Sequence, residues 1–67
     1  MWTGVVWREA GNYGPRGSFE PRENLGRHTF PHDPEVGFVL EINGKQYQVT
    51  SVYLGFCHVR PMKVKPL

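Results

Sequence analysis

Apolar and polar residues alternate most clearly on either side of the Asn43-Gly44 pair. An Asn-Gly pair between two alternating segments is the strongest short-range signal for a β-hairpin closed by a type I′ turn. The pattern therefore predicts a hairpin made of residues 37–42 and 45–53. Its core face would carry five apolar side chains, while the polar residues between them face water: Phe38, Leu40, Ile42, Tyr47 and Val49.

Residues 2–8 form a second extended segment, which is rich in β-branched and aromatic side chains and has no helix signal. We expect a strand here, with Val5 and Trp7 on one face. Trp2 and Trp7 lie five residues apart and so face opposite sides of a regular strand. The prediction places Trp7 in the core and leaves Trp2 partly exposed to a partner or to a second copy of the chain.

The pattern beyond the hairpin changes phase, because the bulky aliphatic residues Val52 and Leu54 do not continue the alternation set by Tyr47 and Val49. A β-bulge near Thr50-Ser51 would produce this change. Gly55 then permits a second tight turn, followed by a strand over residues 56–60. Pro61 limits the last piece, residues 62–65, to an edge strand or a bulge.

Residues 10–35 differ in composition from the rest of the chain, because they contain four of the eight glycines and four of the six prolines. These residues interrupt regular structure, so the sequence predicts a long loop without an element of ordinary length. Short extended pieces at residues 17–20 and 27–30, and one helical turn at residues 21–26, fit between them. Long loops of this kind tend to be functional, and we expect this one to pack partly on the barrel.

These elements predict an all-β protein with a single domain over residues 1–67. Four or five short strands, with glycines at the corners, indicate a small and strongly bent antiparallel sheet or barrel. An SH3-like barrel is the first interpretation and an OB-like barrel the second. No stretch of the sequence matches the motif of a known family.

The composition of the chain indicates its size class and its expected location in the cell, but it says little about its function. A chain of 67 residues builds only a small core, which association with a second copy would enlarge. Cys57 has no second cysteine to pair with, so a disulfide framework is excluded and a cytoplasmic location is expected. No apolar run approaches the roughly 20 residues needed to cross a membrane, and the N-terminus shows no secretion leader. We therefore expect no membrane association.

Charge is distributed unevenly around a net value of +2. The segment from Lys45 to Leu67 holds no carboxylate and four basic side chains: Lys45, Arg60, Lys63 and Lys65. A basic segment attracts nucleic acid or an acidic protein surface. Four charges are few for a nucleic-acid-binding protein, so the charge pattern leaves both partners open.

Residue types suited to metal binding or catalysis occur at His28, His32, Cys57 and His58. Pro31 disfavours the helix that would bring His28 and His32 to one face, and no Cys-x-x-Cys pair is present, so we predict no metal or other cofactor. Neighbouring residues of a strand face opposite sides, which separates Cys57 from His58 and favours a core role for the cysteine. The protein is predicted not to be an enzyme, with a small metal-independent ribonuclease as the less favoured alternative.

Arginines recur every five or six residues in the predicted loop, with aromatic residues between them. This composition is typical of interaction hot spots for proteins and of stacking sites for single-stranded nucleic acid. We predict a non-enzymatic interaction module, such as an accessory subunit or inhibitor, that binds through the loop of residues 10–35 and the basic C-terminal strand. Its first-choice partner is another protein, and the alternative is single-stranded DNA or RNA. The candidate binding residues are Tyr13, Arg16, Phe19, Arg22, Arg27, Arg60 and Lys63.

Overall fold

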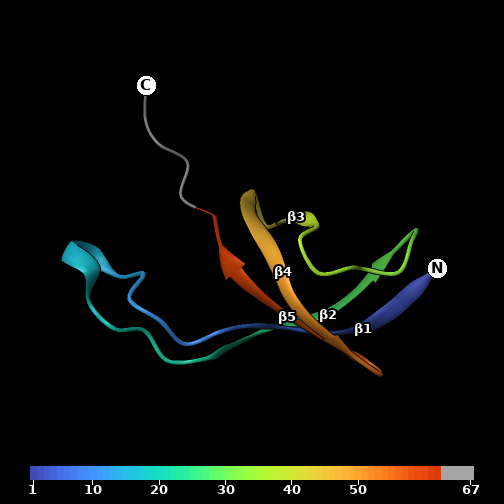
Figure 1. Ribbon diagram of the computed structural model, residues 1–67, viewed down its shortest axis with the longest axis horizontal. Helices are drawn as coiled ribbons and strands as arrows, with labels where there is room; N and C mark the ends of the chain where they lie inside the picture. Colours follow the sequence, from blue (N-terminus) through green and yellow to red (C-terminus); the bar gives the residue numbers. More distant parts are fainter. Residues whose placement is uncertain (63–67) are drawn as a thin grey trace.

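Five strands follow one another along the chain in a computed structural model that describes residues 1–62 (Figure 1). They are β1 (Trp2–Arg8), β2 (Glu23–Phe30), β3 (Val39–Ile42), β4 (Lys45–Tyr53) and β5 (Phe56–Pro61). A single 3₁₀ turn, η1 (Pro15–Gly17), lies between β1 and β2. The predicted strand over residues 62–65 falls mostly outside the described residues.

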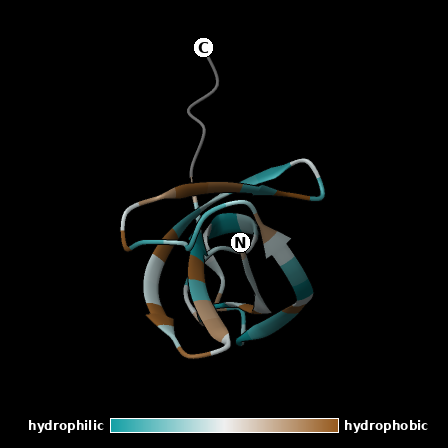
Figure 2. Cartoon of the chain, turned by 90° about the vertical axis from the view of Figure 1, so that its right-hand side faces the viewer, coloured by the Kyte–Doolittle hydropathy of each residue, from teal (hydrophilic) through white to brown (hydrophobic). Residues whose placement is uncertain are grey.

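The strands form one sheet in the order β2-β1-β5-β4-β3. Each pair that is consecutive along the chain is antiparallel, except that β2 and β3 are not hydrogen-bonded to each other. β1 and β5 pair in parallel, so the sheet is mixed and not antiparallel throughout as predicted. Five strands that alternate in direction along the chain leave the first and the last running the same way. The result is a strongly curled half-barrel that is open between β2 and β3 (Figure 2).

The turn between β3 and β4 has the predicted type I′ geometry. Asn43 and Gly44 both have positive φ angles, 53° and 79°. The register also agrees with the prediction, since Leu40 lies opposite Tyr47 and Ile42 opposite Lys45. The bulge expected near Thr50 is present as a shift of register between Val49 and Ser51, and the chain turns again at Gly55.

Replacing Gly44 with alanine is expected to lower the free energy of unfolding by about 1 kcal/mol. A Cβ at this position would meet no atom within 4 Å, so the cost comes only from the positive φ. Urea unfolding of the two proteins measures it. Asn43→Gly is the matched control, because glycine adopts the φ of this position freely. Equal urea midpoints for Gly44→Ala and the wild type would contradict the assigned strain.

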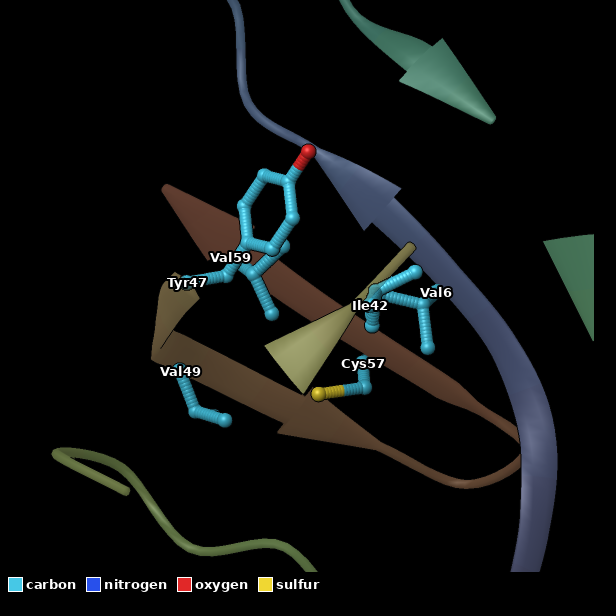
Figure 3. Close-up of a cluster of buried hydrophobic side chains, with 6 residues drawn as sticks. All are labelled: Val6, Ile42, Tyr47, Val49, Cys57 and Val59. Atoms are coloured by element: carbon cyan, nitrogen blue, oxygen red, sulfur yellow. The ribbon is translucent and has the colours of Figure 1, made fainter. Parts of the chain in front are cut away.

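Six side chains from four strands fill the concave side of the sheet and make up its core (Figure 3): Val6, Ile42, Tyr47, Val49, Cys57 and Val59. Of the five side chains predicted for the core face of the hairpin, Ile42, Tyr47 and Val49 are buried. Leu40 is only half-buried and Phe38 is exposed. Trp2 extends this core, because its ring stacks on Phe30 with centroids 5.7 Å apart.

Two predictions about the first half of the chain are wrong. The inward residue of β1 is Val6, which is fully buried, so Val5 and Trp7 face outward and Trp2 packs against the core. Within residues 10–35, the chain forms the eight-residue strand β2 in place of a long loop with a helical turn at 21–26. Gly26, at a φ of 92°, accommodates the bulge at which β2 changes register against β1.

Cys57 occupies the core as a small apolar side chain, and burial raises the pKa of its thiol above the ordinary value of 9.0. The folded protein thus keeps this proton at a pH where the unfolded chain releases it. Stability is therefore expected to fall as the pH rises above 9.0. Denaturant unfolding across this pH range, with Cys57→Ala as the comparison, measures the effect. A decline that is equally steep in Cys57→Ala would show that other groups cause it.

Candidate interaction surface

The convex side of the sheet carries a group of aromatic side chains on three adjacent strands. Alternation along β5 buries Cys57 and Val59 and turns Phe56, His58 and Arg60 outward. Cross-strand pairing places Val5 and Tyr53 on either side of Phe56, and Trp7 and Ser51 on either side of His58. We refer to Trp7, Tyr53, Phe56 and His58 together as the outer aromatic face.

Much of this face is open to solvent. Tyr53 and Phe56, which pair directly across β4 and β5, are 61% and 48% exposed. Leu54, in the turn that joins the two strands, is 99% exposed. Large apolar side chains that gather on a surface mark interaction sites more often than scattered ones do.

His58, like Trp7, is a partly buried member of the outer aromatic face. Its ring meets the Tyr53 ring edge-on, with centroids 5.7 Å apart, and its Nδ1 is buried without a hydrogen-bond partner. Thr50 lies at the bulge opposite and can donate its hydroxyl to the Glu9 carboxylate at 2.8 Å or to the His58 carbonyl at 3.2 Å. The bulge thus engages the Glu9 carboxylate.

Three arginines surround the outer aromatic face. The Arg22 guanidinium lies over the Trp7 ring at 4.5 Å from its centroid, which is a cation–π contact. Arg27 is exposed on β2 and pairs with Val5. Arg60 follows His58 along the same side of β5 and donates to Gln48 Oε1 at 3.1 Å. All three belong to the candidate binding residues predicted from the sequence.

Three other predicted residues lie on the segment between β1 and β2, residues 9–22, which we call the arm. It extends away from the sheet as the blue-to-teal segment of Figure 1. Two backbone hydrogen bonds between Gly11 and Glu20 hold its two sides together. Tyr13 lies near its base, 5.9 Å from the Arg8 guanidinium, whereas Arg16 belongs to η1 and Phe19 is 67% exposed. The arm therefore holds Arg16 and Phe19 away from the outer aromatic face, whereas Tyr13 lines a hollow together with Arg60. Lys63 lies outside the described residues.

Arg8 joins the arm to the sheet. Its side chain is 12% exposed and forms ion pairs with Glu20 at 3.1 Å and Glu23 at 2.8 Å. It also donates to the Pro21 carbonyl at 2.9 Å. Beside it opens a broad hollow of about 600 Å³, lined by polar groups and by Tyr13, Tyr47 and Met62 among others.

The three histidines do not come together. His28 lies on the inner side of β2, where its ring stacks with Phe30 and its Nε2 is 2.8 Å from the Leu25 carbonyl. His58 lies on the outer side of β5, and His32 is exposed in the segment between β2 and β3. Among residues 1–62, no group of three or more His, Cys, Asp or Glu side chains is arranged to hold a metal ion.

Comparison with protein families, with curated proteins and with solved structures finds no match to this chain. Among the described residues, no helix has the length and apolar character needed to span a membrane. The assignment of a site therefore rests on the geometry of the outer aromatic face and of the arginines beside it.

The outer aromatic face was not predicted from the sequence. The signal was present, because a buried Cys57 requires its neighbours Phe56 and His58 to point the other way. The parallel pairing that sets Trp7 beside His58 joins residues about fifty positions apart, and no local pattern in the sequence indicates it.

Proposed function

We propose that this protein is a non-enzymatic interaction module that binds another protein through the outer aromatic face and the three arginines around it. The observation that carries the proposal is the exposure of Tyr53, Leu54 and Phe56 side by side at one end of the β4-β5 hairpin.

The residue types of this surface support a protein partner. Tyrosine, tryptophan and arginine are the side chains most enriched in protein interface hot spots. Trp7, Tyr53 and Arg22 lie on or next to this surface. A rigid sheet also holds such side chains in place before binding, which lowers the entropy lost on association.

We further propose that the half-barrel is SH3-like. Its strands are connected as a meander, since β1 pairs with β2, β3 with β4 and β4 with β5, and the remaining pair joins the first strand to the last. The OB fold is a Greek-key barrel, so the meander connectivity favours the first of the two interpretations. Small barrels of either kind serve many functions, and the proposal for function rests on the surface and not on the fold.

Affinity purification from lysate of the source cell, after nuclease treatment, tests the function. The wild type is expected to retain protein partners that the double variant Tyr53→Ser/Phe56→Ser loses. Both residues are about half exposed, so the variant should fold, as its circular dichroism would show. Val36→Ser, at a 69% exposed position outside the strands, is the matched control. Equal recovery of protein by wild type and double variant would contradict the proposal.

Single-stranded nucleic acid is a second candidate partner, favoured by one observation. The aromatic rings lie between arginines, and bases stack on such rings while guanidinium groups contact phosphates. This alternative predicts binding of a single-stranded oligonucleotide that weakens steeply with salt. A titration at low and at physiological salt measures it, and undetectable binding at low salt would exclude it.

A further inference from the structure

Two of the arginines beside the outer aromatic face, Arg27 and Arg60, lie at opposite ends of it. Arg27 stands on β2, in the row of side chains that continues through Val5 and Phe56 to Tyr53. Arg60 stands on β5, four residues beyond Phe56 along the same side of the strand. Apolar surface therefore lies between two positive ends.

The spacing of these ends follows from sheet geometry. β2 and β5 are two strands apart, which is about 10 Å, and four residues along a strand span about 13 Å. The backbone positions of Arg27 and Arg60 are thus about 16 Å apart on the diagonal. An extended peptide advances about 3.3 Å per residue and covers this distance in about five residues.

We propose that the outer aromatic face binds an extended segment of a partner protein in which two carboxylates, about five residues apart, flank apolar side chains. The carboxylates pair with Arg27 and Arg60, and the apolar residues between them pack on Trp7 and His58, which lie along the line from one arginine to the other. This inference rests on the proposed function, since it names the chemistry of the segment that the protein-binding module recognises.

Charge complementarity selects a short acidic segment over a nucleic acid. The chain contains eight Lys and Arg side chains and six carboxylates, a net charge of +2, which is small for a protein that releases many counterions from a polyanion. The positive charge is local to the face, where Arg22, Arg27 and Arg60 outnumber the Glu9 carboxylate that accepts from the Thr50 hydroxyl.

Selection of twelve-residue peptides from a random displayed library against the whole protein tests the proposal. The recovered peptides are expected to be enriched in pairs of Asp or Glu about five residues apart, with aliphatic or aromatic residues between them. Arg27→Glu is expected to weaken binding of a selected peptide at least tenfold, since it reverses a charge at one end of the face. Arg16→Glu makes the same change on the arm and is the matched control, expected to bind like the wild type.

The site of binding is read from amide chemical shifts of the labelled protein, where the peptide should perturb Arg27, Trp7, His58 and Arg60. Selected peptides without acidic enrichment, or peptides that perturb the arm instead, would overturn this inference and leave the protein-binding function standing. A library that yields no binder, together with salt-sensitive binding of a 15-nucleotide oligo(dT), would overturn both. An equal loss of affinity in Arg27→Glu and Arg16→Glu would also contradict the assigned site.

Discussion

Replacing Gly4 with alanine is expected to destabilise the protein by about 3 kcal/mol, because the added Cβ has no space. A Cβ at this position would lie 2.6 Å from the Gly55 carbonyl oxygen and 2.6 Å from the Trp2 ring. The ring can rotate away, but the carbonyl cannot move freely. It accepts a hydrogen bond of 3.0 Å from the Val5 amide, which ties β1 to the turn before β5.

Urea unfolding of Gly4→Ala against the wild type measures this cost, and a loss of about 3 kcal/mol would leave little of the stability expected for so small a domain. Thr3→Ala is the neighbouring control. It removes an exposed hydroxyl that is 2.9 Å from the Thr29 hydroxyl and should cost less than about 0.5 kcal/mol. The double variant Trp2→Leu/Gly4→Ala should remain less stable than Trp2→Leu alone, since the carbonyl contact persists. Equal midpoints for that pair would assign the strain to the ring and contradict the argument.

Local signals in the sequence predicted the second half of the fold. Asn43-Gly44 and Gly55 each require a positive φ, and both turns occur where those residues stand. The change of phase after Val49 correctly indicated a bulge. Each of these features depends on a few consecutive residues, so a single sequence contains the information needed to find it.

The inward face of β1 depends on distant residues, and its prediction failed for that reason. Both sides of this strand are apolar, so bulk alone favoured Val5 and Trp7 over Val6. Pairing with β5 decides the matter, because Trp7 aligns with the outward His58 and Val6 with the buried Cys57. The apolar residues left outside by this choice form part of the outer aromatic face.

The strand β2 was missed because its interruptions were read as the signature of a loop. Pro21 and Pro31 lie outside its two ends, and Gly26 lies at a bulge inside it. Proline is tolerated where the ladder stops, and glycine where a bulge requires a positive φ. The prolines therefore mark the limits of a strand and the glycine marks its bulge. Only the pairing of this segment with β1 reveals the strand, and that pairing cannot be read from the sequence.

The candidate site was also predicted only in part: its arginines were identified from the sequence, and its aromatic residues were not. Arg22, Arg27 and Arg60 were selected from the sequence because arginines spaced among aromatic residues are typical of binding surfaces. Their aromatic neighbours in the structure are different ones from those expected. Phe19 and Tyr13 lie on the arm, whereas the rings beside the three arginines come from strands that only the folded sheet brings together.

Arg8→Met is expected to release the arm and to lower the free energy of unfolding by about 2 kcal/mol. The guanidinium of Arg8 holds Glu20, Glu23 and the Pro21 carbonyl at the same time, and methionine keeps the apolar stem but none of these contacts. The paired amides of Gly11 and Glu20 should then exchange with solvent at least tenfold faster.

Hydrogen exchange followed by nuclear magnetic resonance distinguishes a released arm from a weakened sheet. In Arg8→Met, the amides of Gly11 and Glu20 should gain more in rate than that of Val49, whose 2.8 Å bond to Phe38 lies far from the arm. Arg8→Lys should give an intermediate result, because an ammonium group retains the charge without the planar fork that reaches three acceptors. Arg16→Met, at the η1 turn, should leave all three rates unchanged. If the Gly11 amide exchanges in Arg8→Met at the wild-type rate, the backbone pairing holds the arm by itself, and Arg8 serves only to neutralise the two carboxylates.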